Sequence, residues 1–249
     1  MKKIKVCYFN GSNRANGRTN KIINLFFENL SKNSKFDYKF INLIEEGTQI
    51  KTCIGCLNCF KKGICPLDDS ITKIKQTMMN SDIVVFATPV YMGFVSGQMK
   101  IFLDRLSLWT HLQKLLTKKC VLIVVTQNTS LDETTKYLYE VVSNFGLEII
   151  GCITLRINDS YDNIEQQIEL VTSRINRQFY YNVNSFPNFY RRGLFTNLQT
   201  HYRSYYQIKY FTYETNYWKQ KNYLDEKATL EYILNNYVEE DENGRGSVK

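Results

Sequence analysis

The sequence predicts an α/β fold in which a doubly wound parallel sheet is followed by an aromatic-rich, mainly helical extension. Short apolar runs alternate with segments whose apolar residues recur every three or four positions, which is typical of strands alternating with helices. Two of the runs, residues 83–87 and 120–125, are apolar throughout, as expected for parallel strands covered on both faces. Alternation of this kind indicates helices on both sides of one sheet.

Residues 1–182 carry this alternation and are expected to form one domain. Five strands are predicted, at residues 4–9, 38–43, 83–87, 120–125 and 147–157. Ser130 and Glu133 form a capping-box pattern at the start of a helix, and Gly146 is placed to end it. Apolar residues at helical spacing predict the intervening helices: Ile22, Ile23, Phe27 and Leu30; Met99, Phe102, Leu103 and Leu106; Leu138, Val141, Val142 and Phe145; Ile164, Ile168, Val171, Ile175 and Phe179.

Residues 183–238 form the predicted extension, and the polar residues 239–249 are expected to be a disordered tail. Residues 183–249 hold 15 of the 35 aromatic residues, too many for a solvated segment. We therefore expect burial against the chain's own core, a partner subunit or a ligand site, and we favour a homodimer contact. The aromatics concerned are Tyr202, Tyr205, Tyr206, Trp218, Tyr223 and Tyr237. Helical spacing is expected for Leu194, Leu198, Tyr202 and Tyr205, and for Leu230, Ile233, Leu234 and Tyr237.

Charge and hydropathy narrow the classes of function. The formal net charge is +8, and residues 183–249 hold nine basic against eight acidic side chains, so the positive excess lies in residues 1–182. Such a field attracts an anionic cofactor, a nucleotide or an acidic partner. No nucleic-acid recognition motif accompanies it. The sequence has no apolar run of the roughly 20 residues that cross a bilayer, and the lysine-flanked start is interpreted as a strand, so a cytoplasmic protein without a membrane partner is expected.

The first expected strand leads into a polar loop, Gly11 to Asn20, that precedes a helix. It lacks the Gly-Lys-Ser/Thr ending of a Walker loop and the spacing of a dinucleotide fingerprint. Backbone N–H groups at such a helix start bind phosphate, aided by the helix dipole. A solvated turn without a ligand is the alternative. The candidate phosphate ligands are Ser12, Asn13, Arg14, Gly17, Thr19 and Asn20.

Two motifs in order carry a family resemblance. The loop has the form Gly-Ser-x-Arg-x-x-Gly-x-Thr, and Thr88 to Gly93 with Lys100 and Asp104-Arg105 gives Pro-Val-Tyr followed by Lys-x-x-x-Asp-Arg. Over residues 4–157 the chain resembles the NADPH-dependent FMN reductase family. The resemblance implies a flavodoxin-like fold that binds FMN at the carboxyl edge of the sheet. Lys100 with Asp104-Arg105 has an alternative role as an ion pair on a helix surface.

The resemblance also implies which residues meet the flavin ring. Pro89, Val90, Tyr91 and Met92 follow the third strand, so their backbone and side chains are expected along the ring. Family members often carry glycines after the fourth strand, whereas this chain has Thr126 to Ser130. Gln127 and Asn128 are the candidate ring contacts there.

Four cysteines, Cys53, Cys56, Cys59 and Cys65, lie within 13 residues after the second strand. Thiols so close together suit an iron–sulfur cluster, and the motif is similar to that of iron–sulfur flavoproteins, which carry FMN and a [4Fe-4S] cluster. Asp68-Asp69 fits the same resemblance. Free or redox-active thiols and a structural zinc are the alternatives. The remaining cysteines, Cys7, Cys120 and Cys152, are expected to be small buried hydrophobes.

The predicted function is transfer of hydride from NADH or NADPH through FMN to a quinone, a flavin or an aromatic compound. The alternative is an iron–sulfur flavoprotein that exchanges electrons with a partner through FMN and a [4Fe-4S] cluster. No catalytic side chain is predicted, because the flavin carries the chemistry. Only two histidines, His111 and His201, are available, so hydrolytic triads are not indicated. Expected partners are a small-molecule or protein electron acceptor and further copies of the chain.

Overall fold

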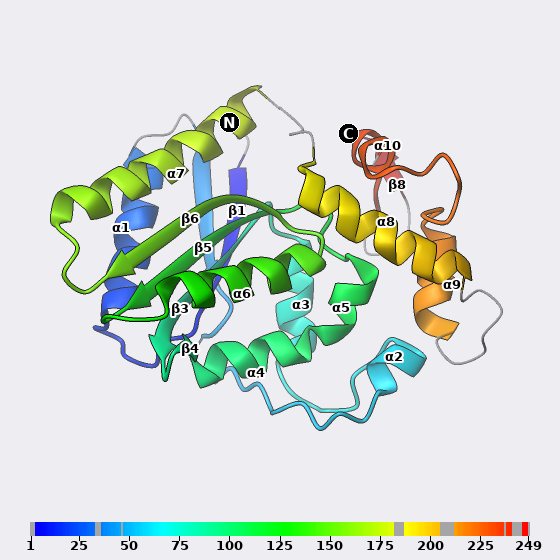
Figure 1. Ribbon diagram of the computed structural model, residues 1–249, viewed down its shortest axis with the longest axis horizontal. Helices are drawn as coiled ribbons and strands as arrows, with labels where there is room; N and C mark the ends of the chain where they lie inside the picture. The colour runs from blue at the N-terminus through cyan, green and yellow to red at the C-terminus, as the bar shows by residue number, and fades with distance from the viewer. Residues whose placement is uncertain are drawn as a thin grey trace.

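The predicted parallel sheet is confirmed in a computed structural model, which describes residues 3–32, 36–45, 47–181, 187–204, 212–236, 238–240 and 246–248. Five strands run parallel in the order β2-β1-β3-β5-β6, the order of flavodoxin-like sheets (Figure 1). A sixth short strand, which the sequence did not indicate, pairs antiparallel with β3. The strands of this sheet are β1 (Lys3–Asn10), β2 (Asp37–Asn42), β3 (Ile83–Tyr91), β4 (Phe94–Val95), β5 (Lys119–Thr126) and β6 (Glu148–Arg156).

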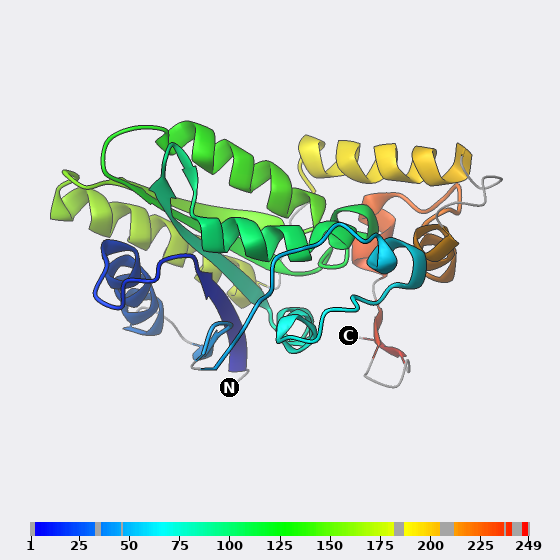
Figure 2. The same cartoon turned by 90° about the horizontal axis from the view of Figure 1, so that it is seen from below.

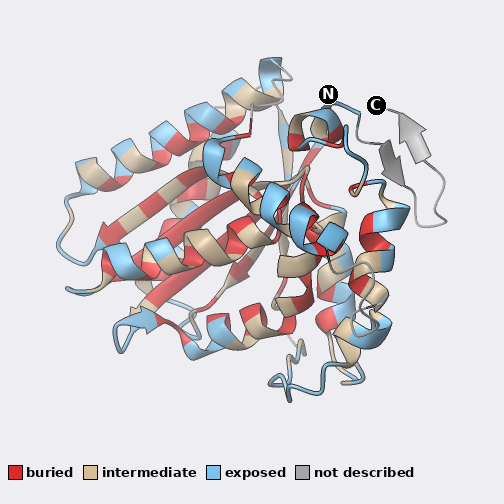
Figure 3. Cartoon of the chain, turned by 45° about the vertical axis from the view of Figure 1, so that its right-hand side comes forward, coloured by how far each residue is buried: buried red, intermediate tan, exposed pale blue. Residues whose placement is uncertain are grey.

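Helices cover both faces, so the central strands are buried along most of their length (Figure 3). One face is covered by α1 (Arg18–Lys32) and α7 (Tyr161–Tyr181), whose apolar stripes pack on β1, β3, β5 and β6. Of the stripe predicted for α7, Ile164, Ile168, Val171 and Ile175 are buried, whereas Phe179 is half-buried.

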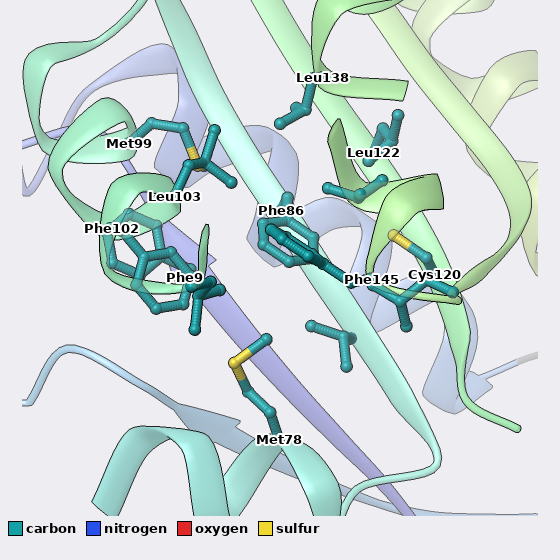
Figure 4. Close-up of a cluster of buried hydrophobic side chains, with 14 of the residues drawn as sticks. Phe9, Met78, Phe86, Met99, Phe102, Leu103, Cys120, Leu122, Leu138 and Phe145 are labelled. Carbon is teal, nitrogen blue, oxygen red and sulfur yellow. The ribbon is translucent and has the colours of Figure 1, made fainter. Parts of the chain in front are cut away.

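The other face carries the larger core cluster, in which aromatic rings fill the space between the sheet and the helices (Figure 4). Phe9 of β1 stacks on Phe102 at a ring distance of 4.0 Å, and Phe86 lies beside them. Four helices cover this face: α3 (Ile71–Met79), α4 (Gly97–Arg105), α5 (Ser107–Leu112) and α6 (Leu131–Asn144).

The expected capping box at α6 is not formed. Ser130 has a left-handed backbone, with φ 59° and ψ 28°, and its side chain makes no capping hydrogen bond. A capping box needs an extended backbone at the cap residue, so the pattern of residues alone was not sufficient. Gly146, with φ 92°, follows the last turn as predicted.

The extension is mainly helical, as predicted, and lies beside α5 and a short helix α2 (Asn58–Lys62) in both views of the chain (Figures 1 and 2). It contains α8 (Phe189–Ser204), α9 (Thr212–Gln220) and α10 (Leu230–Asn235). Tyr202, Trp218 and Tyr223 are buried in a third core together with apolar residues of the α/β domain. The preferred explanation, burial across a homodimer, is therefore wrong for these three aromatics, because their own chain covers them.

The buried face of α8 also differs from the prediction. Phe195, Gln199 and Tyr202 are buried, whereas Leu194 and Leu198 are half-buried. The buried Gln199 donates hydrogen bonds from its Nε2 to the carbonyls of Tyr223 and Ala228, at 2.6 and 2.9 Å.

Leu230 and Ile233 of α10 are buried as expected, and Leu234 is half-buried. Tyr205, Tyr206 and Tyr237 lie outside the described residues.

Within residues 239–249, for which disorder was expected, the structure describes β7 (Val238–Glu240) paired antiparallel with β8 (Gly246–Val248). The division at residues 182 and 238 stays a prediction. Among the described residues, no helix combines the length and apolar character that crossing a membrane requires.

Candidate functional site

The strand order reverses between β1 and β3, and in doubly wound sheets ligands bind at the carboxyl ends of the strands flanking such a point. The loop after β1 and the hairpin after β3 meet there. Gly11 donates its backbone N–H to the Ala87 carbonyl at 2.7 Å. A methyl group on Gly11 would approach Ser96 Oγ to 2.7 Å, so glycine is needed for this close approach.

The loop between β1 and α1 is shaped by hydrogen bonds among its own residues. Asn10 accepts the Ser12 backbone N–H at 3.0 Å and donates to Asn20 Oδ1 at 2.6 Å. Asn20 in turn donates to the Ala15 carbonyl at 2.6 Å. The loop therefore holds its conformation through the side chains of Asn10 and Asn20.

Several donors at this loop suit a phosphate group. Within the described residues, the backbone N–H groups of Asn13 and Asn16 have no hydrogen-bond acceptor. The first turn of α1 follows directly, where N–H groups lack intrahelical acceptors. Arg14 is exposed at the loop, and a methyl group on Gly17 would lie 3.0 Å from the Arg14 carbonyl. Free N–H groups, a helix start and a cation fit the phosphate of FMN. Thr19 differs from the other predicted phosphate ligands because it is buried, with 3% of its surface exposed.

The β3–β4 hairpin presents apolar side chains at the same edge. Met92 and Gly93 both have positive φ, 52° and 79°, as in the two-residue type I′ turn. Tyr91, Met92 and Phe94 are 46%, 104% and 38% exposed. Large exposed apolar side chains around a polar loop are typical of a ligand site.

The third predicted segment lies beside this hairpin. A methyl group on Gly93 would be 3.5 Å from Ser130 Oγ, so the β3–β4 and β5–α6 connections are neighbours. Gln127 and Asn128 are exposed in the latter, and Thr126 Oγ1 donates to the Thr129 carbonyl at 2.8 Å. The three segments predicted from the sequence are thus adjacent at one edge of the sheet.

The cysteine loop, residues 51–69, lies between β2 and α3. Cys53 and Cys56 are exposed, whereas Cys59 and Cys65 are half-buried. Among the described residues, no group of three or more His, Cys, Asp or Glu side chains is arranged to hold a metal ion. Burial raises the pKa of the Cys59 thiol, and the charges of Cys65 and Cys53 are near enough to raise it as well. Three of the four predicted ligands therefore share one neighbourhood without forming a closed site.

Arg105 fastens this loop to α4. Its guanidinium donates to both oxygens of Asp69, to the Lys51 carbonyl at 2.6 Å and to Cys65 Sγ at 3.4 Å. The side chains of Arg105 and Asp69 are 1% and 0% exposed. Although burial acts in the opposite direction, hydrogen bonds from Arg105 and the backbone lower the pKa of Asp69.

The alternative role, a surface ion pair, is found for Lys100 and Asp104, whose charged atoms are 2.5 Å apart on the outside of α4. Arg105 is buried instead. Its partner Asp69 lies 36 residues away in the chain, so helical spacing could not identify it. In the sequence, the signal for this buried ion pair was the presence of two motifs, Asp68-Asp69 and Asp104-Arg105.

Lys75 of α3 is a second cation near the thiols, and no sequence pattern indicated it. Burial lowers its pKa, while the charges of Cys59 and Cys65 oppose that shift. Its Nζ lies 5.7 Å from the centre of the Trp109 ring. Lys75 and Arg105 thus place positive charge beside Cys59 and Cys65.

Comparisons with known proteins find relatives over the α/β domain. The family described as NADPH-dependent FMN reductase matches residues 4–160. An iron-sulfur flavoprotein of Clostridioides difficile is 26% identical over 188 residues, which cover 74% of this chain and 81% of that protein. An iron-sulfur flavoprotein of Archaeoglobus fulgidus is 31% identical over 142 residues, covering 57% of this chain and 63% of that protein.

A solved structure of an NADH:FMN oxidoreductase in its apo form has the same fold. It aligns with a TM-score of 0.51 at 17% identity, covering 74% of this chain and 92% of that one. At this identity the likeness concerns the fold.

Proposed function

Because the chain belongs to the NADPH-dependent FMN reductase family and is a flavin oxidoreductase, we propose that it transfers hydride from NADH or NADPH through FMN to an acceptor. The acceptor classes are quinones, flavins and aromatic compounds. The observation that carries the proposal is the meeting of three predicted segments, after β1, β3 and β5, at the carboxyl edge of the sheet.

The phosphate of FMN would be held by Ser12, Asn13, Arg14, Gly17, Thr19 and Asn20. The N–H groups of Asn13 and of the first turn of α1 supply donors, and Arg14 supplies positive charge. The loop is already held by Asn10 and Asn20, so little conformational entropy would be lost on binding.

The flavin ring would lie against the β3–β4 hairpin and the β5–α6 connection. Pro89 and Val90 would offer backbone groups, Tyr91 and Met92 an apolar wall, and Gln127 and Asn128 amide groups for the ring edge. Tyr91 and Met92 are exposed and would become covered by the ring, which favours binding.

Bound FMN supplies the hydride and electron chemistry, and the protein supplies position and electrostatics. Neither histidine is required for this. His111 contacts Glu214 in the extension rather than the three segments above. The positive excess of residues 1–182 would attract the anionic nicotinamide nucleotide.

The second candidate function is electron transfer by an iron–sulfur flavoprotein, with a [4Fe-4S] cluster on Cys53, Cys56, Cys59 and Cys65. The names of the two relatives and the four-thiol spacing favour it. The described conformation would have to close, bringing the exposed Cys53 and Cys56 toward Cys59 and Cys65. When bound, the cluster would supply single-electron transfer.

FMN affinity tests the first proposal. Replacing Ser12 and Thr19 together by Ala should weaken FMN binding by about 1–3 kcal/mol, the scale of leaving a buried polar group without its hydrogen-bond partner. Titration of apoprotein, followed by flavin fluorescence, measures the dissociation constant. The double variant Thr200→Ala with Ser173→Ala, at exposed positions of α8 and α7, is the control. Unchanged FMN affinity in the first variant would contradict the assignment of Ser12 and Thr19 to this phosphate site.

A visible spectrum separates the two functions. Anaerobically purified protein with FMN alone gives two resolved bands, whereas a cluster adds a broad shoulder and requires iron and acid-labile sulfide. Iron and sulfide near zero would exclude the electron carrier and leave the reductase. Nicotinamide oxidation with a quinone acceptor then tests the reductase directly.

A further inference from the structure

We propose that the C-terminal extension positions the cysteine loop, by holding α2 and covering Cys59 through the contact between Tyr213 and Gly63. This assigns a function to the extension that the family match, which ends at residue 160, does not include. The relevance of this positioning to a metal centre rests on the second candidate function. The contact between the extension and α2 does not depend on that function.

Gly63 ends α2 with a left-handed backbone, φ 74°, and its N–H donates to the Cys59 carbonyl at 2.8 Å. The ring of Tyr213 lies directly over it, so that a methyl group on Gly63 would approach Tyr213 Cε2 to 2.2 Å. Both the conformation and the neighbouring ring therefore require glycine at this position.

Two side chains of α2 pack toward the extension as well. Cys59 and Phe60 pack against the third core, which contains Trp218 and Tyr202. The Phe60 ring meets the His111 ring edge-on at 5.1 Å. Cys59 is half-buried for this reason, while Cys53 and Cys56 on the same loop are exposed.

The helix that carries Tyr213 is itself fixed to the α/β domain. Trp218 Nε1 donates to the His111 carbonyl at 2.8 Å, and His111 Nδ1 lies 2.7 Å from Glu214 Oε1. Glu214 is 2% exposed and adjoins Tyr213. Helices α5, α9 and α2 thus form one continuous contact, as the neighbouring positions of α2 and α9 in Figures 1 and 2 also show.

The cysteine loop is therefore held at two places. Arg105 binds its two ends through Lys51 and Asp69, and the extension holds α2 in its middle. The stretch 51–57, with Cys53 and Cys56, has no helix or strand. Cys59 and Cys65 are thus held by packing and hydrogen bonding, whereas Cys53 and Cys56 are exposed in the stretch without helix or strand.

Residue-resolved alkylation tests the proposal on the full-length, FMN-loaded, metal-free protein. Under native conditions, iodoacetamide should label Cys53 and Cys56 about tenfold faster than Cys59, since burial protects a thiol. Tyr213→Ala should raise the Cys59 rate about fivefold or more. The rates of Cys53 and Cys56 and the FMN content should not change.

Tyr232→Ala is the matched control, because Tyr232 is 55% exposed on α10 of the same extension, and it should leave all rates unchanged. Gly63→Ala gives a second route to the same selective effect if Tyr213→Ala does not fold. An unchanged Cys59 rate in a folded Tyr213→Ala or Gly63→Ala protein would overturn the proposal. An equal rise at all cysteines would also overturn it, because it would indicate general loosening.

Iron loading distinguishes a failure of this positioning proposal from a failure of the second candidate function. If the cluster forms, anaerobic reconstitution of Tyr213→Ala should give less iron per chain than wild type or Tyr232→Ala. Wild-type protein without iron would reject the cluster, whereas the alkylation rates would still decide the positioning.

Discussion

Arg105 and Asp69 form a buried ion pair, and removing either charge is expected to destabilise the fold. Both side chains are essentially inaccessible, and the remaining donors of Arg105 reach Lys51 and Cys65. Charges that are buried and fully hydrogen-bonded contribute little net stability, but removing one partner leaves the other uncompensated. This pair therefore matters chiefly for where the cysteine loop lies.

Asp69→Asn should lower the free energy of unfolding by about 3–5 kcal/mol, because it leaves a buried guanidinium without its counter-charge. Urea denaturation at neutral pH measures the change. Asp104→Asn is the control: it breaks the exposed pair with Lys100 and should cost no more than about 0.5 kcal/mol. Equal effects of the two substitutions would contradict the distinction between a buried and an exposed pair.

The same carboxyl predicts a pH dependence. The pKa of Asp69 in the folded protein lies below its ordinary value of 3.8, so the ionised form stabilises the fold. That contribution is complete above the ordinary value and is lost as the pH falls through the lower, folded value. The stability difference between wild type and Asp69→Asn should stay constant at neutral pH and shrink below about pH 4. A difference that grows on acidification would contradict this assignment.

At the scale of elements, the β3–β4 hairpin determines which apolar side chains a ligand would contact at the sheet edge. Its two-residue turn places Met92 in the left-handed region, where few residues other than glycine and asparagine are common, and exposes its side chain fully. The residues on either side, Tyr91 and Phe94, are paired across the hairpin. The hairpin thus holds an apolar surface in a defined position.

Gly93→Ala should cost about 1–2 kcal/mol of stability and weaken FMN binding, because alanine is strained at φ 79°. The nearest atom to the added methyl group, Ser130 Oγ at 3.5 Å, is at an ordinary contact distance, so the backbone is the cause. Thermal denaturation and FMN titration measure both effects. Gly97→Ala, at the start of α4 with no atom within 4 Å of the new methyl group, should be neutral or slightly stabilising.

At the scale of the whole molecule, the extension completes the α/β domain. Leu108, Leu112 and Leu116 belong to the domain, yet they are buried by Phe195 and Trp218 of the extension. Arg191 strengthens the junction, donating to the carbonyls of Leu116 and Gly146 at 2.8 and 2.9 Å. The domain surface beneath the extension is therefore apolar and unsuited to solvent.

A chain ending at residue 182 should be poorly soluble and bind hydrophobic dyes, because removing the extension exposes this apolar surface. Size-exclusion chromatography and dye fluorescence measure the effect. Replacing Leu112 and Leu116 by Gln in the shortened chain should restore solubility, and a chain ending at residue 236, which keeps the third core, should behave as wild type. A soluble shortened chain without dye binding would contradict the packing described for α8 and α9.

The sequence by itself determined the sheet, the order of its loops and the candidate FMN residues on them. Continuous apolar runs such as residues 83–87 are sufficient to specify buried parallel strands, because burial on both faces leaves no polar position. Once the strands are parallel, the segments after them must meet at the same edge. Gly11, Met92 and Gln127 could be assigned to that edge without knowledge of any contact.

Only the tertiary structure decided what the polar and aromatic residues outside this pattern contact. Arg105 could serve a helix surface or a distant carboxylate, and the choice depends on where the cysteine loop packs. Ser130 has the right identity for a capping box, but the turn before α6 gives it a left-handed backbone. Burial was expected for the aromatics of the extension and is found for Tyr202, Trp218 and Tyr223, yet their partner, the apolar face of α5, became known only from the fold. Periodicity records which residues avoid water, whereas long-range packing determines which surface covers them.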